Sequence, residues 1–593
     1  MRQRLAVWRD LIRLNWQADR RAVVLIAMSA PLDAIGITLV SVGQRHVIDS
    51  AASNLLSGIL AAALLGAVGH LITNGVNRSS ANLQFSQSER VDVLVNDALL
   101  REINRVPTLE HLERSDYLDR VATLSRGTRS LAGACWSLLS VVTAVVQLGL
   151  STWLLFDVHP MLALLVLFAV PPLWTATQVQ KPVRRARAAT AESQRQEAML
   201  HQLCLEPGSA GELRLARASG AVDAAASDLW RSSHRTLFLA RLAATGWQFS
   251  GWAIYATGYI GALALGAWLV GRGRATIGDL ALLVTLGSQL RAQVSGAAHE
   301  VTAVGETEQY VEHLAWLRQH AAAHNHEGGV AVPVWLNTGI KLENVEFSYP
   351  GSGQPALTGV NAVLEAGKTV AVVGANGAGK TTLVKLLTGL YRPTAGTITV
   401  DSQCLHELDG TAWRQHSTAV YQDFMEFHVS AQQAIGIGDI ARMDDRETVL
   451  AAVGRAGAEE VIATLQAGLD TQLGHPNGAD LSRGQWQKLA LARGAMRPQA
   501  LLTVLDEPTA ALDPLAEHEL YQRYKDRAVQ TGGGITVLVS HRFATVRMAD
   551  HIIVFDSGRV MEQGSHDDLM ELEGIYARLY RIQQDGYAPQ ENS

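Results

Sequence analysis

Long windows without any Asp, Glu, Lys or Arg dominate the first 300 residues of the chain. Four of them exceed the roughly 20 residues that a helix needs to cross a bilayer, namely Ala51–Asn77, Ser130–Phe156, Val158–Gln180 and Leu242–Gly271. A fifth window, Ala22–Gln44, is interrupted only by Asp33, and a sixth, Leu280–Glu300, contains Arg291. The pattern therefore predicts six membrane-spanning helices, at about 22–44, 54–77, 131–156, 158–180, 246–271 and 277–299.

The connections between these windows alternate between long, basic segments and short ones. The segment after the second predicted span contains Arg78, Arg90, Arg101, Arg105, Arg114, Arg120, Arg126 and Arg129, and the one after the fourth contains Lys181, Arg184, Arg185, Arg187 and Arg195. Positively charged segments next to spans stay on the cytoplasmic side. These segments, and with them the N-terminus, are therefore predicted to lie in the cytoplasm.

Residues 1–21 form a further, basic segment ahead of the first span. An uneven apolar stripe runs through it at roughly helical spacing, made of Leu5, Trp8, Leu11, Ile12 and Trp16. Such a stripe is typical of an amphipathic helix that lies on a membrane surface in contact with lipid. A cleaved signal peptide fits less well, because the apolar run that follows is too long and further spans come after it.

Asp33 and Arg291 stand out as ionisable residues within the predicted spans. A charged side chain at the centre of a span costs about 2.5–3.5 kcal/mol to insert, so Asp33 is expected to face a cavity or a partner. Two interpretations remain open. In one, Asp33 makes a hydrogen bond between helices or a salt link to Arg291. In the other, these residues line the path of a transported molecule.

Composition and charge limit the classes of protein to consider. Residues of the AVILMFWYC set make up 48% of the 593 residues and charged residues only 18%, an average that indicates an apolar part joined to a soluble one. The formal net charge of −6 supplies no basic field, so no nucleic-acid partner is predicted. The three cysteines, Cys135, Cys204 and Cys404, lie far apart without CxxC spacing, which excludes a disulfide framework.

The chain changes character after residue 318. The stretch expected to be a linker, residues 319–338, contains three histidines between residues 320 and 326, followed by two glycines. Three clustered histidines also suit a metal site. No cluster of carboxylates or cysteines accompanies them at ligand spacing, however, and a glycine pair is typical of a linker. From Trp335 onward, strand and helix patterns alternate.

A strand pattern at Thr369–Val373 leads directly into a glycine-rich loop and an apolar helix at Leu383–Leu390. The loop reads Gly374-Ala375-Asn376-Gly377-Ala378-Gly379-Lys380-Thr381-Thr382, which is G-x-x-x-x-G-K-T in the strand–loop–helix context of a phosphate-binding loop. In such a loop backbone N–H groups surround the phosphates, and the following helix points its positive end at them. Lys380 is expected to reach the β and γ phosphates of ATP, and the Thr381 hydroxyl to bind Mg²⁺.

A second apolar strand, Leu501–Leu505, ends in the acidic pair Asp506 and Glu507. In P-loop enzymes the aspartate at such a strand end holds the Mg²⁺ shell. Glu507, one residue further on, is placed to act as the general base that polarises the attacking water. Either acid alone would fit an ordinary acidic strand end, but the pair at this separation from the P-loop indicates a nucleoside triphosphatase.

The sequence Leu481-Ser482-Arg483-Gly484-Gln485 precedes this strand and narrows the class. Together with the P-loop and the acidic pair, it resembles the ABC ATPase family, whose signature usually reads LSGGQ. The resemblance covers about Lys341 to Leu579. It implies that Tyr349 stacks on adenine, that Gln422 is the catalytic Q-loop glutamine that also contacts Mg²⁺, that Asp513 belongs to the D-loop and that His541 is the catalytic switch histidine.

Arg483 is a departure from the family pattern, since it replaces the first glycine of the signature pair. Ser482 and Gly484, which the family uses to contact the γ-phosphate across a dimer, are retained. Two interpretations are open. Arg483 is a tolerated variant that points away from the phosphate, or it slows turnover.

Six spans ahead of a single ATPase domain resemble the exporter-type half-transporter. The fold class that follows is an α-helical transmembrane domain over residues 1–318, joined by the linker to an α/β P-loop ATPase domain over residues 339–582. A helical subdomain is expected to carry the signature motif, and residues 583–593 are expected to be a C-terminal tail.

This resemblance implies ATP-driven transport by alternating access in the inner (plasma) membrane of a bacterial cell. In the family each ATP lies between the P-loop of one copy and the signature of another, so the expected partner is a second copy in a homodimer or a related half-transporter. The stretches Tyr421–His428 and Leu481–Lys488 are similar to exporters of lantibiotic-type peptides, although lipids and drug-like molecules fit an amphipathic substrate equally well. An exporter-fold importer, an ATP-gated channel and, more remotely, a non-transport ABC ATPase are the alternatives.

Overall fold

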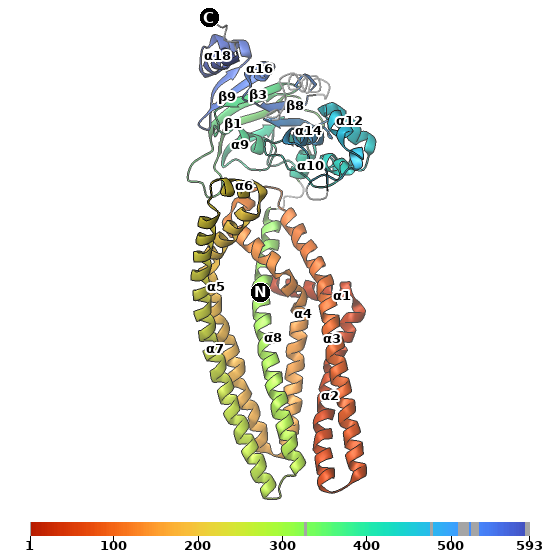
Figure 1. Cartoon of the computed structure of the whole chain (residues 1–593). Helices are drawn as coiled ribbons and strands as arrows, with labels where there is room; N and C mark the ends of the chain where they lie inside the picture. The colour runs from red at the N-terminus through yellow and green to blue at the C-terminus, as the bar shows by residue number, and fades with distance from the viewer. Residues whose placement is uncertain (1, 325–328, 475–477, 508–520, 524–532, 588–593) are drawn as a thin grey trace. The chain divides into compact units, whose positions relative to one another are not determined.

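The computed structural model describes residues 2–324, 329–474, 478–507, 521–523 and 533–587. The chain divides into two compact units (Figure 1). The first contains Met1–Glu102 and Arg120–Gln319, and the second contains Ile103–Asp119 and His320–Ser593. The segment Ile103–Asp119 therefore belongs to the unit formed by the C-terminal half of the chain, although it is far from that half in sequence.

Helices build the first unit. They are α1 (Arg2–Ala18), α2 (Arg20–Ala52), α3 (Leu56–Asn104), α4 (Ser115–Val158), the 3₁₀ helix η2 (Pro160–Ala169), α5 (Val170–Leu205), α6 (Pro207–Leu215), α7 (Ser219–Gly271) and α8 (Ile277–His324). Among the described residues, five helices are long and apolar enough to cross a membrane: α2, α3, α4, η2 continued by α5, and α7.

The sixth predicted span is not confirmed. It falls within α8, which is one unbroken helix, but this helix is not among those apolar enough to span a membrane in the described part of the chain. The physical reason lies in its middle, where Gln289, Arg291 and Gln293 follow one another at every second position and reduce the mean hydropathy.

The long helices extend well beyond their apolar windows. At 1.5 Å per residue, the 49 residues of α3 and the 53 residues of α7 correspond to about 75–80 Å, against a bilayer core of about 30 Å. Apart from Arg105 and Arg114, the basic residues predicted to be cytoplasmic therefore lie on these long helices. Arg90 and Arg101, for example, lie on α3.

Small residues let neighbouring helices of this unit approach closely. A Cβ atom at Gly43 of α2 would lie 2.8 Å from the backbone nitrogen of Gly66 in α3, so a larger residue would push the two helices apart. Helices α5 and α7 run beside each other in the same way (Figure 1), with Gly251 of α7 packed against Thr175 of α5.

The described residues of the second unit form two sheets. The strands are β1 (Gly339–Phe347), β2 (Leu357–Glu365), β3 (Thr369–Gly374), β4 (Ala395–Val400), β5 (Gln403–Cys404), β6 (Ser417–Val420), β7 (Leu502–Asp506), β8 (Ile535–Val539), β9 (His551–Asp556) and β10 (Arg559–Gly564). The first sheet is antiparallel in the order β2-β1-β4-β5, and the second has the order β10-β9-β3-β8-β7-β6. In the second sheet β9, β3, β8, β7 and β6 are parallel, and β3, β7 and β8 are buried along their whole length, as expected for strands covered on both faces.

The second unit also contains short helices. They are η1 (Glu110–Glu113), α9 (Lys380–Leu387), α10 (Gly410–Gln415), α11 (Ala431–Gly436), η3 (Ile440–Arg442), α12 (Arg446–Ala456), α13 (Glu459–Thr464), η4 (Gly468–Asp470), α14 (Arg483–Gly494), α16 (Phe543–Val546), α17 (His566–Glu571) and α18 (Ile575–Tyr587). One hydrophobic core joins β1, β2 and β4 of the first sheet to β3 and α9. A second core joins α11–α14 to the ends of β6, β7 and β8. The signature motif lies in this second, helix-rich part.

Parts of the segments expected to be linker and tail belong to helices or pair with other segments of the chain. Helix α8 continues through the start of the linker to His324, and Val330 then pairs with the chain at Glu407 and Asp409 by backbone hydrogen bonds of 2.7 and 2.9 Å. The tail expected from residue 583 begins inside α18, which continues to Tyr587.

Candidate functional site

The glycine-rich loop connects β3 to α9 through backbone conformations that side chains disfavour. Gly374, Gly377 and Gly379 have φ angles of +155°, +80° and +102°. A Cβ atom at Gly374 would lie 2.2 Å from the carbonyl oxygen of Phe555, and one at Gly379 would lie 2.6 Å from the Leu357 side chain. The spacing of the glycines is therefore required both by the turn itself and by the strands packed against it.

Lys380 is the first residue of α9, and its side chain is buried against the loop. The ammonium donates hydrogen bonds to the carbonyl oxygens of Gly374 (2.8 Å) and Ala375 (3.0 Å) and lies 3.3 Å from Nε2 of His541. Burial lowers the pKa of Lys380, while nearby carboxylates act in the opposite direction. The loop thus holds a cation at its centre, where a phosphate oxygen could replace the carbonyl acceptors.

The acidic pair lies at the carboxyl edge of the parallel sheet. Strands β7 and β8 are neighbours in register, with Asp506 opposite Val539, so the residues that follow each strand meet at that edge. Glu507 has a left-handed backbone, with φ of +48°, and its Oε1 atom lies 2.6 Å from Nε2 of His541. A non-glycine residue in this conformation is strained, and strain of this kind clusters at functional sites.

Asp506 and Thr381 together offer oxygen atoms to a cation. The buried Asp506 carboxylate accepts a hydrogen bond of 3.1 Å from the Thr381 hydroxyl. Burial raises the pKa of Asp506, and the Thr381 hydrogen bond acts against that. Two such oxygens fit Mg²⁺, which takes few protein ligands and keeps waters and phosphate oxygens. Among the described residues no group of three or more His, Cys, Asp or Glu could hold a metal ion.

The residues implied for adenine and for water positioning lie around the same loop. The Tyr349 hydroxyl is 3.0 Å from the Thr382 hydroxyl at the start of α9, and its ring lies edge-on to Phe347. Lys385 approaches the Tyr349 ring at 5.4 Å from its centroid. Gln422 is exposed two residues after β6, the strand that pairs with β7.

The signature motif forms the beginning of α14. Ser482 is the N-cap of this helix: its hydroxyl accepts a hydrogen bond from the Gln485 backbone at 3.3 Å, and Gln485 Oε1 accepts one from the Ser482 backbone at 2.8 Å. Leu481 is buried, whereas Arg483 is exposed at the first helical position. In the described part of the chain no hydrogen bond or ion pair links these residues to the P-loop. Asp513 of the expected D-loop lies outside the described residues.

Two further residues shape the site and were missed by sequence reasoning. Gln583 of α18 donates a hydrogen bond of 3.0 Å to the carbonyl oxygen of His541 and accepts one of 2.8 Å from the Phe543 backbone. Arg493 of α14 donates hydrogen bonds to the carbonyl oxygens of Ala434 (2.8 Å) and Met425 (3.2 Å). Neither residue belongs to a motif. The S-x-x-Q spacing of Ser482 and Gln485, by contrast, is a readable capping signal.

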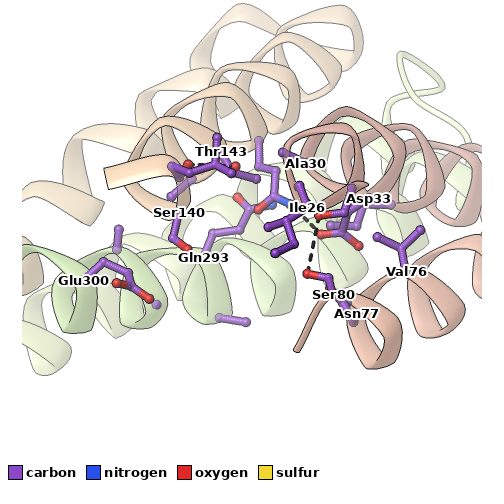
Figure 2. Close-up of a pocket in the computed structure, with 18 of the residues that line it drawn as sticks. Ile26, Ala30, Asp33, Val76, Asn77, Ser80, Ser140, Thr143, Gln293 and Glu300 are labelled. Carbon is purple, nitrogen blue, oxygen red and sulfur yellow. Dashed lines mark hydrogen bonds between the residues drawn. The ribbon is translucent and has the colours of Figure 1, made fainter. Parts of the chain in front are cut away.

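Asp33 and Arg291 are not brought together. Asp33 of α2 accepts a hydrogen bond of 2.7 Å from Gln147 Nε2 of α4 and lines a cavity of about 380 Å³ (Figure 2). Arg291 is exposed on α8, does not line that cavity and forms no ion pair with Asp33. One interpretation expected a hydrogen bond between helices at Asp33, and the bond from Gln147 is such a contact. Asp33 also lines a cavity, which suits the other interpretation, a residue on a transport path.

Comparison with known proteins supports the predicted resemblance of the second unit to ABC ATPases. Residues 357–510 match the family described as ABC transporter. The chain is 31% identical over 315 residues to the nisin transport ATP-binding protein of Lactococcus lactis subsp. lactis, covering 53% of this chain and 52% of that protein. It is 38% identical over 259 residues to the ATP-dependent lipid A-core flippase of Chromobacterium violaceum, covering 43% of each chain. The chain thus spans about half the length, or less, of the curated relatives it matches.

A solved structure extends the likeness to nearly the whole chain. The structure described as a bacterial Atm1-family ABC exporter with ATP bound matches 95% of this chain and 99% of its own, with a TM-score of 0.79 and 24% sequence identity. The fold of the chain is therefore that of an ABC exporter, and the predicted resemblance to an exporter-type half-transporter is confirmed at this level.

Proposed function

We propose that this chain is an ATP-driven transporter that exports an amphipathic peptide, lipid or drug-like molecule by alternating access. The observation that carries the proposal is the convergence of chemically complementary side chains at one edge of the parallel sheet, in a chain with the fold of an ABC exporter. These side chains are Lys380, Thr381, Asp506, Glu507 and His541.

ATP is the proposed substrate of this edge. Its phosphates would lie against the backbone of the glycine-rich loop and exchange with the carbonyl oxygens that now accept hydrogen bonds from Lys380. Tyr349 is proposed to stack on the adenine. The full proposed ATP-binding set is Tyr349, Gly374, Asn376, Gly377, Ala378, Gly379, Lys380, Thr381 and Thr382.

Thr381, Gln422 and Asp506 are the residues that would hold Mg²⁺. When bound there, the ion would neutralise charge on the phosphates. The contact between Thr381 and Asp506 already brings two of the three groups together.

Hydrolysis is assigned to Glu507 and His541. A carboxylate oxygen of Glu507 accepts the proton of the attacking water as general base, while Gln422 helps to orient that water. His541, which lies 2.6 Å from Glu507, orients its carboxylate and contacts the γ-phosphate. The fixed distance between these two side chains is what the mechanism needs, because a misplaced base loses much of its effect.

Two copies are needed to complete each ATP site. The sequence contains one P-loop and one signature, and no hydrogen bond or ion pair among the described residues joins them. This supports closure of each site by Leu481–Gln485 of a second copy. Asp513 would belong to the same junction. We propose a homodimer, with a related half-transporter as the alternative partner.

The membrane arrangement is part of the proposal. Residues 1–318 form the transmembrane domain with six spans, α8 supplying the sixth, in the inner membrane of a bacterial cell. Five apolar helices and their arginine-rich extensions support this placement, with the ATPase domain from residue 339 in the cytoplasm. Because α18 continues past residue 582, the ATPase domain is extended to include it.

The segment that joins α3 to α4 is proposed to transmit ATPase closure to the spans. Within the second unit, Leu109 donates a backbone hydrogen bond of 2.9 Å to Leu390, and the Arg392 backbone donates one of 3.1 Å to Glu110. The Tyr391 hydroxyl also donates to the Glu113 carboxylate. These contacts begin three residues after the end of α9, so a movement of the P-loop helix has a direct route to this segment.

The test is the ATPase rate of the full chain in lipid nanodiscs, with Glu507→Gln as the blank. Amphipathic peptides, lipids and amphiphilic drugs are added in turn. We expect Glu507→Gln to retain ATP binding and to lose hydrolysis by about 10²-fold or more. Saturable stimulation of the wild-type rate by one class would identify the exported substrate.

Other outcomes count against specific parts of the proposal. Hydrolysis by Glu507→Gln at the wild-type rate would remove Glu507 from its role. A wild-type rate that no added class changes would argue against coupled export and favour an importer or an ATP-gated channel.

A further inference from the structure

The cavity in Figure 2 has a polar wall in a region made of apolar helices. It lies among α2, α3, α4 and α8 of the first unit, and more than half of its lining residues carry a hydroxyl, amide or carboxyl group. Polar side chains within membrane-spanning segments are rare and face a bundle interior or a polar cavity. The lining therefore favours a ligand that places a polar group at this position.

Most of these polar groups already have partners in neighbouring helices. Gln289 accepts a hydrogen bond of 3.2 Å from Ser41, and Gln293 donates one of 3.3 Å to Ser151. Asp33 is different: Gln147 donates to its Oδ2 atom and the Asn77 side chain also lies next to the carboxylate, but the buried Oδ1 atom accepts no hydrogen bond of normal geometry from the described residues. A buried acceptor on a carboxylate is thus left for a group outside the chain.

The charge of the wall has one sign. Glu300 is the second carboxylate of the cavity and lies well apart from Asp33 in Figure 2, on α8. It forms no hydrogen bond or ion pair with any described residue, and no Lys, Arg or His belongs to the described lining. A negative wall without a counter-charge excludes anions and attracts cations, most strongly where little water is present.

We propose that this cavity binds the cationic head of the transported amphiphile. The positive group of an organic cation pairs with the free Oδ1 atom of Asp33, while Glu300 attracts it from the other end of the cavity. A volume of about 380 Å³ suits a compact cationic head, with an apolar remainder left among the helices. This inference rests on the proposed export function, to which it adds the charge of the substrate.

Binding of two ions of nearly the same shape and opposite charge tests the inference. Tetraphenylphosphonium and tetraphenylborate are titrated onto the full chain in nanodiscs without ATP, and binding to empty nanodiscs is subtracted. We expect saturable binding of the phosphonium and no saturable binding of the borate. Asp33→Asn should weaken phosphonium binding by about ten-fold or more, because one partner of the charge pair is lost.

Two further variants keep the result readable. Asp33→Glu retains the charge and should retain the preference for the cation, which separates loss of charge from loss of folding. Asp97→Asn is the matched control: Asp97 is half-exposed on α3 and pairs with Arg101 four residues later at 2.7 Å, outside the cavity. Its affinity for the phosphonium should equal that of the wild type.

Three outcomes would overturn the inference: equal binding of both ions, binding of neither, or wild-type affinity in Asp33→Asn. Because this binding is measured without ATP, it does not depend on hydrolysis. A wild-type ATPase rate above the Glu507→Gln blank, with no preference for the cation, would end this inference and leave the proposed ATPase function intact. Cation binding without any such ATPase rate would support this inference and end the proposed ATPase function.

Discussion

At the scale of single residues, the proposed catalytic edge depends on a side chain that no motif identifies. Gln583 bonds both the carbonyl oxygen of His541 and the backbone N–H of Phe543, so it fixes the backbone turn that contains His541. It acts through His541 rather than on ATP, and is therefore a positioning residue.

Gln583→Ala should lower ATP turnover with little effect on ATP affinity, because the P-loop is untouched while His541 loses its fixed turn. We expect a fall in kcat of roughly ten-fold with KM for ATP nearly unchanged, measured by steady-state ATPase kinetics in nanodiscs. The matched control is Gln584→Ala, since Gln584 is the adjacent, exposed residue of α18. Equal kinetics in the two variants would remove the positioning role.

A second effect at this scale concerns pH. His111 of η1 is 4% exposed, packs edge-on against Tyr117 and has its ring centroid 6.2 Å from that of His320. Burial lowers the pKa of His111 to about 4, and the nearby histidines act in the same direction. The unfolded chain binds a proton near the ordinary value of about 6.5, so folding stability is lost as pH falls from 6.5 toward 4.

His111→Gln should therefore reduce the loss of stability on acidification. We expect the wild type to lose about 1–3 kcal/mol of stability between pH 7 and pH 4.5 through this residue. The measurement is the thermal unfolding midpoint of the full chain across that range. His406→Gln, at an exposed position, serves as control. If the wild type and His111→Gln respond to acid in the same way, this histidine does not titrate as described.

At the scale of elements, a single arginine joins the Q-loop region to the helix that begins with the signature. Arg493 of α14 bonds the carbonyl oxygens of Ala434 and Met425, and its guanidinium lies 4.5 Å from the Phe427 ring centroid. Burial lowers the pKa of Arg493 to about 10, which leaves it charged at neutral pH. The planar guanidinium satisfies both carbonyl groups at once with N–H groups held in a fixed geometry.

Arg493→Ala should destabilise the helix-rich part of the second unit, because two carbonyl groups lose their donors. A cost of about 2–4 kcal/mol is expected, seen as a lower thermal midpoint and faster limited proteolysis of the full chain. Arg446→Ala is the control, since its ion pair with Asp470 at 3.0 Å is at the surface and contributes little. Similar midpoints for both variants would contradict the proposed role.

At the scale of the whole molecule, each ATP site is proposed to take Lys380 from one copy and Ser482 from the other. Defects placed in the same chain or in opposite chains then have different consequences. A dimer of Lys380→Ala with Ser482→Arg has one site with both defects and one intact site. A dimer of the double variant with the wild type has one defect in each site and no intact site.

Dimers of defined composition, purified through two different affinity tags, test this arrangement. The dimer with defects in opposite chains should hydrolyse ATP at a measurable rate, about ten-fold or more above the dimer whose defects share one chain, because only the former has an intact site. Equal rates would contradict the shared site, and recovery of an unlike chain in place of the second tagged copy would favour a related half-transporter.

The sequence by itself determined those features that depend on neighbouring residues. Charge-free windows predict apolar helices because a span must satisfy its own backbone, and five of these helices are present in the structure. The P-loop was equally readable, since Gly374, Gly379 and Lys380 act within one turn of chain between β3 and α9. The sixth span was not determined in this way, because the polar residues around Arg291 interrupt its pattern.

Only the tertiary structure decided which distant residues meet. Gln583 reaches His541, Gln147 reaches Asp33, and Glu110 reaches Arg392, across separations of 42, 114 and 282 residues. Such pairs leave no periodic signal, because each side chain is chosen by a neighbour that the chain brings close only on folding. The residues of the proposed ATPase edge could therefore be identified from local motifs, whereas the contacts that support them and the free carboxylate oxygen of Asp33 could be found only in the folded chain.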